Sequence, residues 1–239
     1  RGLPHNVTTE MDLELWQLAM RIGRDAESRA TVLATEPETL AAAYASGELP
    51  SVVQTGLAAF LDRYGHRAVA EIDLGMPRWS DEPEHLLGVL ANYLRLDDPE
   101  LAPDRQFAHG AEVAEAAITE IIAATHRDGR LGPIRARLMA VALDRCRALI
   151  GLRERPKSIM AYALASARRE LMPVGRAAVA AGTIDAVEDT IFLDFRQLRS
   201  AIGGVDQRAV VRERRVGGRV EVRRPATPPA PPSPRAPPG

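Results

Sequence analysis

The sequence predicts a mainly α fold: a multi-helix bundle with one minor extended element near residues 189–195 and a disordered C-terminal tail. Helix-favouring residues dominate the 239 residues and aromatic residues make up only 4% of them, a composition that disfavours β-sandwiches and barrels. Apolar residues also recur at helical spacing, as Leu15, Leu18 and Ile22 do. Too few segments alternate like strands to build a sheet, so helices must form the core.

Glycine, proline and capping residues place the helix boundaries. Thr35 and Glu38 have the spacing of a capping box, and Gly47 and Gly65 are typical helix stops. Pro173 lies inside a helical pattern and is expected to kink or split that helix. In chain order, the predicted helices cover about residues 9–33, 35–47, 51–65, 81–93, 104–127, 132–150, 157–181 and 194–201.

The stretch DTIFLDF at residues 189–195 differs from the helical pattern around it. Ile191 and Leu193 alternate with Phe192 and Asp194, which is typical of a short β-like run. We therefore expect a small extended element there, before the chain returns to a helix.

The C-terminal stretch has a different composition from the rest of the chain. Residues 208–224 contain seven arginines, and residues 225–239 contain eight of the chain's 18 prolines. Such a proline-rich segment cannot form a helix or bury a core, so it is predicted to be disordered. We divide the chain into a helical domain, residues 1–206, expected to be incomplete at its N-terminus, and a basic, then proline-rich tail, residues 207–239, expected to be disordered.

Charge and hydropathy argue against several classes of partner. The formal net charge is −1, so no overall basic field favours nucleic acid. No apolar run approaches the roughly 20 residues of a membrane helix, and the start of the chain lacks the apolar core of a secretion signal. We therefore expect a cytoplasmic protein that binds neither nucleic acid nor membrane. The single cysteine, Cys146, leaves no internal disulfide and reads as a packed helix residue.

The motifs of a self-sufficient enzyme are missing. The sequence has no glycine-rich phosphate-binding loop of the G-x-x-x-x-G-K-[ST] or G-x-G-x-x-G type and no ligand set for zinc. Its five histidines are scattered, and none lies in a glycine–serine context suited to phosphorylation. We expect no catalytic residue, no metal and no cofactor bound by this chain.

A charged, irregular stretch, FLDRYGHRAVAEIDLGMPRW at residues 60–79, interrupts the helical pattern. Arg67 and Glu71 are four residues apart and would meet on one helical face. One interpretation is a structural ion pair that ties a loop to the bundle, with Trp79 as a packing anchor. The other is a polar wall for a ligand, because the planar guanidinium of arginine suits carboxylates and phosphates.

A second cluster, GLRERPKS at residues 151–158, gathers positive charge between two predicted helices. Cations at a helix N-terminus are unfavourable for the helix dipole by roughly 0.3–1 kcal/mol. A sequence that places Arg153, Arg155 and Lys157 there is either collecting positive potential for an anion or forming a solvated basic loop.

Four stretches in this order form a specific pattern: RGLPHNVTTEMDLEL, FLDRYGHRAVAEIDLGMPRWSDEP, GLRERPKS and AGTIDAVEDTIFLDFRQLRSA. The set, over roughly residues 1–202, resembles the central helical region of rifampicin phosphotransferases and the related phosphoenolpyruvate-synthase-like, PEP-utilising proteins. From about Gln207 the chain departs from that pattern.

The resemblance implies a division of labour in which this chain is one part. In that family an N-terminal ATP-grasp domain would bind ATP and Mg²⁺, and a swivelling domain would carry the phosphoryl group on a histidine. The central helical domain would bind the acceptor, an ansamycin-like or other hydroxyl-bearing small molecule. Arg153 and Lys157 match the arginine and lysine of the family's R-E-x-P-K motif, which implies positive charge for the phosphoryl oxygens. Arg67 and Glu71 match a motif without an assigned role.

Three hypotheses for function follow. The first is the substrate-binding helical portion of an ATP-dependent, dikinase-type phosphotransferase, inactive without ATP-grasp and phosphohistidine domains supplied in cis or in trans. The second is a non-catalytic helical interaction module whose proline-rich tail binds partners. The third is a truncated fragment without function.

Overall fold

The computed structural model describes residues 5–222, which contain α-helices and 3₁₀-helices and no β-strand. The predicted mainly α class is therefore confirmed. The chain forms two compact units, the first ending at Arg168 and the second beginning at Arg169. The division falls inside one helix, so the predicted domain of residues 1–206 contains all of the first unit and part of the second.

The core of the first unit is built by five helices that precede residue 95. They are α1 (Val7–Arg24), α2 (Ala26–Ala34), α3 (Pro37–Ser46), α4 (Ser51–Tyr64) and α5 (Glu84–Leu94). Leu18 from α1, Leu57 from α4 and Leu90 from α5 are at most 1% exposed and belong to one apolar cluster. Helices α1, α4 and α5 each contribute a stripe of apolar residues to that cluster, as their spacing predicts, and α2 and α3 contribute Val32 and Leu40.

Two predicted helix starts differ from the structure. The helix predicted over residues 9–33 is broken at Asp25, whose backbone is extended and whose side chain accepts a hydrogen bond from the N–H of Ser28 at 2.9 Å. An aspartate that satisfies an N-terminal N–H in this way starts a new helix. The predicted capping box of Thr35 and Glu38 is wrong, because α3 begins at Pro37 without a side-chain cap and Thr35 ends α2.

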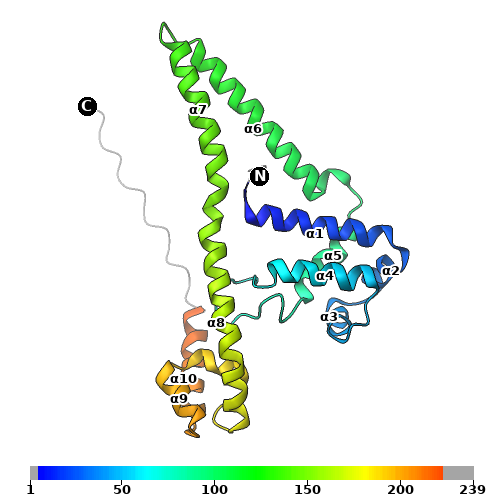
Figure 1. The fold of residues 1–239 in the computed structure, drawn as a ribbon, viewed down its shortest axis with the longest axis vertical. Coiled ribbons are helices and arrows are strands. Elements are labelled where there is room, and N and C mark those ends of the chain that lie inside the picture. Colours follow the sequence, from blue (N-terminus) through cyan, green and yellow to red (C-terminus); the bar gives the residue numbers. More distant parts are fainter. Residues whose placement is uncertain (1–4, 223–239) are drawn as a thin grey trace, which may run out of the picture. The chain divides into compact units, whose positions relative to one another are not determined.

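A long helical hairpin follows the five-helix core (Figure 1). The short 3₁₀-helix η1 (Pro99–Leu101) leads into α6 (Pro103–His126), which packs against α7 (Gly132–Ile150). Both helices lie close to their predicted positions. In α7, Gly132 and Ala136 are buried, and such small residues allow the two helix backbones to approach closely.

The second unit contains the end of α8 (Arg155–Ala180), the 3₁₀-helix η3 (Val187–Phe192), α9 (Phe195–Ile202) and α10 (Arg208–Val222). Pro173 lies within α8 and does not split it. A small apolar core joins these elements, and its buried members are Ala178, Ile184, Leu193, Leu198, Ala201 and Val211.

The extended element predicted near residues 189–195 is a 3₁₀-helix over most of its length. The carboxylate of Asp189 accepts hydrogen bonds from the N–H groups of Asp185 and Ala186 at 3.2 and 2.9 Å, and the hydroxyl of Thr190 donates to the carbonyl of Val187 at 2.8 Å. These local bonds compete with an extended backbone. Only Leu193 and Asp194 are extended, as the link into α9.

The disorder predicted for the whole tail is wrong for its first part, which is helical. Helix α10 begins at Arg208, and its residue Val211 is 3% exposed in the core of the second unit. The buried valine attaches the basic segment to the apolar core. The high arginine content of this segment gave no sign of that contact. The proline-rich part of the tail, residues 225–239, lies outside the described residues, so its predicted disorder is not tested.

Two glycines in helix interiors should respond to alanine in opposite ways. A Cβ added at Gly175 would lie 2.6 Å from the carbonyl oxygen of Val187 and 2.9 Å from Thr190, whereas one added at Gly88 meets nothing closer than 3.7 Å. We expect Gly175→Ala to lower the stability of the second unit by about 1–3 kcal/mol. We expect Gly88→Ala to raise the stability of the first unit by up to about 1 kcal/mol.

Chemical denaturation of each variant, followed by circular dichroism, measures both effects. Stabilisation by Gly175→Ala would contradict the close approach of α8 and η3.

Candidate functional site

The segment of residues 65–81 forms a closed loop of turns between α4 and α5. The N–H of Trp79 donates to the carbonyl of Arg67 at 2.8 Å, and the N–H of Ser80 donates to the carbonyl of Gly65 at 3.0 Å. These two bonds join the ends of the segment. Trp79 itself is 8% exposed and belongs to the apolar core, so the loop is anchored from within.

Arg67 and Glu71 form a buried ion pair in this loop. Their side chains are 4% and 9% exposed, and an Nη of Arg67 lies 2.7 Å from Oε1 of Glu71. The sequence predicted this contact from helical spacing, yet the backbone between them forms turns. The geometry is that of a structural ion pair, and neither side chain presents a surface to a ligand. Their binding of a substrate or a phosphate stays a prediction.

Two more buried arginines donate hydrogen bonds to backbone carbonyls of the loop. Arg78 donates to the carbonyls of Glu71 and Asp73 at 3.0 and 3.1 Å. Arg168, on α8, pairs with Asp81 at 3.2 Å and donates to the carbonyls of Leu74 and Gly75. Arg78 and Arg168 are 2% and 4% exposed. Burial, followed by the nearby charge of Arg168, lowers the pKa of Arg78.

Because Arg168 belongs to α8, these bonds fasten the loop to that helix. A second contact does the same: the ring of His66 meets the ring of Tyr162, also on α8, edge to face at a centroid distance of 5.4 Å. Burial and the charge of Arg67 lower the pKa of His66, which favours the neutral ring. The loop therefore determines where α8 lies in the first unit.

Arg153 and Lys157 lie at the start of α8 and in the turn before it. Residues Gly151–Glu154 form the 3₁₀-helix η2, and α8 starts at Arg155. Pro156 explains the tightened turn, because its ring would clash with the carbonyl of residue 152 in a regular α-helix. Both predicted site residues are exposed, and the guanidinium of Arg153 lies 3.5 Å from the carboxylate of Glu154.

The helix N-terminus predicted at this cluster is not a free one. The backbone at Ile150, Gly151 and Arg155 is helical, and the N–H of Arg155 donates to the carbonyl of Leu152. The chain thus passes from α7 into α8 without exposing a set of N–H groups. Any positive potential at the cluster comes from its side chains. Arg153 and Lys157, four residues apart on this helical path, are neighbours on its surface.

Helix α1 packs against η2. Its N-terminal N–H groups are satisfied by Asn6, whose side chain accepts from the N–H groups of Thr8 and Thr9 at 3.0 and 3.2 Å. Helix α1, whose first turns belong to the first of the four stretches that carry the resemblance, thus lies against η2, which belongs to the third.

Comparison with known proteins identifies the family. A family model described as "Rifampicin phosphotransferase fourth domain" matches residues 1–154. The chain belongs to the rifampicin phosphotransferase family. The resemblance carried by the four stretches is thereby confirmed, and the matched residues include η2 with Arg153.

Relatives of the family extend the match toward the second unit. The chain is 29% identical over 201 residues to a rifampicin phosphotransferase of Streptomyces sviceus, covering 83% of this chain. It is 32% identical over 230 residues to one from a Streptomyces species and 26% identical over 204 residues to one from Bacillus subtilis, covering 88% and 84% of this chain. The chain spans 23–24% of the length of these relatives.

The described residues contain neither a cluster of metal ligands nor a helix that could span a membrane. No group of three or more His, Cys, Asp or Glu side chains is arranged there to hold a metal ion. Every helix in the same part of the chain is too short or too polar to cross a lipid bilayer.

The pair of Arg168 and Asp81 was not predicted from the sequence. Arg168 lies in an ordinary helical stretch, and its partner is 87 residues away along the chain. No local pattern marks such a pair. The irregular composition of residues 60–79 was the available signal, and it indicated the loop without its partner on α8.

The buried and exposed ion pairs of the first unit should differ strongly in their contribution to stability. Glu71→Gln leaves the guanidinium of Arg67 buried without a counter-charge, and breaking a buried pair in this way costs about 3–5 kcal/mol. Asp128→Asn is the control, because the Arg135–Asp128 pair is 57% and 72% exposed, and exposed pairs contribute about 0–1 kcal/mol. Urea denaturation measures both changes, and equal losses in the two variants would contradict the structural role of Glu71.

Proposed function

We propose that this chain is the acceptor-binding helical portion of an ATP-dependent phosphotransferase that transfers a phosphoryl group to a hydroxyl of a small molecule. Its membership of the rifampicin phosphotransferase family supports this proposal most directly. The names of the relatives make rifampicin, or a related ansamycin, the first candidate for the acceptor.

Arg153 and Lys157 carry the chemical role in this proposal. Both side chains are exposed at the junction of η2 and α8, where a group delivered by another domain can reach them. Their charges would stabilise the oxygens of the phosphoryl group as the acceptor hydroxyl approaches, which is the main contribution a protein makes to phosphoryl transfer. Neither residue forms or breaks a covalent bond.

The remaining parts of the reaction belong to other domains. We propose that an ATP-grasp domain binds ATP and Mg²⁺ and that a phosphohistidine domain delivers the phosphoryl group, in cis or in trans. This chain would then be inactive alone, with a cytoplasmic location where ATP is available. These partner domains and the location are part of the proposal.

The reaction can be reconstituted to test the cluster. The chain is mixed with ATP-grasp and phosphohistidine domains from a Streptomyces relative, ATP, Mg²⁺ and rifampicin, and phosphorylated product is measured by mass spectrometry. We expect product in the full mixture and none from the chain alone. Removing a group that stabilises transition-state charge costs about 10²–10³ in rate, so we expect a loss of that order in Arg153→Ala and in Lys157→Ala.

The matched control is Arg155→Ala, which removes the same charge from the same exposed segment at a position outside the R-x-x-x-K pair. We expect it to keep activity within a few-fold of the unmodified chain. Equal losses at all three positions would indicate a general electrostatic effect and contradict the specific roles of Arg153 and Lys157. Absence of product from a mixture whose domains associate would contradict the proposed function itself.

A further inference from the structure

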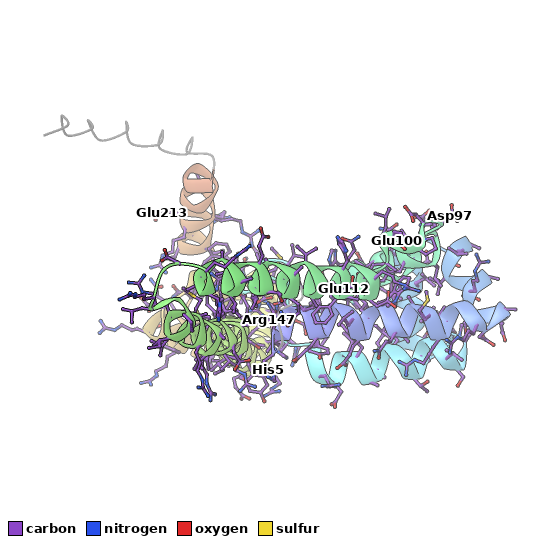
Figure 2. All side chains as sticks on the ribbon, turned by 90° about the horizontal axis from the view of Figure 1, so that it is seen from above. His5, Asp97, Glu100, Glu112, Arg147 and Glu213 are labelled. Atoms are coloured by element: carbon purple, nitrogen blue, oxygen red, sulfur yellow. The ribbon has the colours of Figure 1, made fainter. Side chains whose placement is uncertain are left out.

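A cavity of about 460 Å³ lies between the first turns of α1, the end of α5 and the start of α6. Its lining includes Thr8, Asp12, Tyr93, Leu101, Pro103 and Phe107. All of these residues belong to the first unit. Seen from above, α6 and α1 run in nearly the same direction (Figure 2), whereas Figure 1 shows that only the start of α6 lies near α1; the two helices pack against each other. The volume falls within the roughly 300–1,000 Å³ of small-molecule sites.

One wall of the cavity is apolar and aromatic. The ring of Tyr93 and the side chain of Phe107 are partly exposed, and Leu101 at the rim is 59% exposed. Tyr93 is held in place from behind, because its ring meets the buried ring of Trp16 edge to face at a centroid distance of 5.4 Å. The wall is therefore pre-formed on the side of Tyr93, and it offers apolar surface that a ligand body would cover.

The part of the lining that α1 supplies carries oxygen atoms. Thr8 and Thr9 contribute hydroxyl groups, and Asp12 contributes the only charged group among the described residues that line the cavity. The hydroxyl of Tyr93 donates to Oδ1 of Asp12 at 2.5 Å. Burial, reinforced by this bond, raises the pKa of Tyr93 above its ordinary range. The phenol therefore keeps its proton and serves Asp12 as a fixed donor.

The Asp12 carboxylate has more acceptor capacity than one phenol uses, since two oxygens offer about four lone pairs. It is exposed, so a hydrogen-bond donor on a bound molecule can reach it. A negatively charged group next to it would be repelled. The wall therefore selects for molecules that donate a hydrogen bond and against molecules that bring a second negative charge.

We propose that this cavity is a small-molecule binding site for a neutral or cationic aromatic compound that carries a hydroxyl or an ammonium donor. Asp12 accepts a hydrogen bond from that donor, Tyr93 orients the carboxylate, and Phe107 with the Tyr93 ring covers the apolar body. The Asp12–Tyr93 pair determines specificity. Binding at the cavity stands by itself; that the bound molecule is the phosphoryl acceptor rests on the proposed function.

The position of the cavity suits an acceptor. Helix α1 supplies Thr8, Thr9 and Asp12 to the cavity and also packs against η2, which carries Arg153. In Figure 1 the end of α1 nearest the junction of α7 and α8 is its N-terminal end, where Thr8 lies. One end of a molecule held along this helix would thus point toward the basic cluster.

Rifampicin is the first probe, and isothermal titration calorimetry with the whole chain is the measurement. We expect saturable binding of one molecule. We expect Asp12→Asn and Phe107→Ala each to weaken rifampicin binding at least tenfold. Asp12→Asn removes the negative charge that accepts the hydrogen bond from the ligand, and Phe107→Ala removes an aromatic ring from the cavity wall. Asn retains an acceptor for Tyr93, so the fold should be preserved, and thermal unfolding followed by circular dichroism checks this.

The matched control is Glu14→Gln. Glu14 accepts from the hydroxyl of Tyr64 at 3.0 Å, so it forms the same type of tyrosine–carboxylate bond from the same helix. It lies about 200° around the helix from Asp12 and outside the cavity. We expect the affinity of the Glu14→Gln variant for rifampicin to differ less than twofold from that of the unmodified chain. Absence of saturable binding, or equal losses in Asp12→Asn and Glu14→Gln, would overturn the proposal.

Charge selection is tested with two probes that share one aromatic body, 1-naphthylmethylammonium and 1-naphthoate, by saturation-transfer NMR. We expect a transfer signal from the cation that is lost in Asp12→Asn, and a much weaker signal from the anion. Preference for the anion would overturn the assigned role of Asp12.

These results separate the cavity from the proposed function. Binding at the cavity without phosphoryl transfer in the reconstituted mixture would contradict the proposed function but not the proposed binding site. Phosphoryl transfer that depends on Arg153 and Lys157, with an unchanged KM for rifampicin in Asp12→Asn and Phe107→Ala, would contradict the proposed binding site but not the proposed function.

Discussion

The first unit depends on the way buried guanidinium groups hold the loop of residues 65–81. Arginine suits this task because its planar group offers five donors, enough to satisfy several loop carbonyls and a carboxylate at once. Arg78 belongs to the loop and donates to two of its carbonyls, whereas Arg168 donates to two loop carbonyls from α8. A loop without regular secondary structure leaves many carbonyls unpaired by the backbone, and these side chains take the place of the missing backbone donors.

This attachment connects the two candidate sites. Helix α8 carries Lys157 near its start and Arg168 about three turns later, so the place where Arg168 is held determines where the basic cluster lies. The cavity is built on the same helical core, from α1, α5 and α6. Helix α1 lines the cavity and packs against η2, so the cavity and the basic cluster are both attached to one helix of the first unit. In the proposed function, a fixed distance between the two would orient the reactants.

The sequence was sufficient for features that depend on short-range pattern. Helical spacing predicted α6 and α7, glycine predicted the end of α3, and the motif match predicted the family. Local bonds that spacing does not reveal produced the errors: Asp25 breaks a predicted helix, and Asp189 with Thr190 turns a strand-like alternation into a 3₁₀-helix. The cavity was missed because Asp12 and Tyr93 are 81 residues apart. The burial of Val211 was not predicted, because its segment is rich in arginine and its apolar partners are brought to it only by the fold of the second unit.

Amide hydrogen exchange at Trp79 and Ser80 tests most directly whether Arg168 holds the loop to α8. Their N–H groups close the loop, and they should be protected in the unmodified chain. In Arg168→Gln we expect these amides and others within residues 65–81 to exchange at least tenfold faster, while amides of α1 and α4 keep their protection. Arg63→Gln, which removes an exposed guanidinium, should leave the loop unchanged. Equal protection of Trp79 and Ser80 in the Arg168→Gln and unmodified proteins would contradict the account.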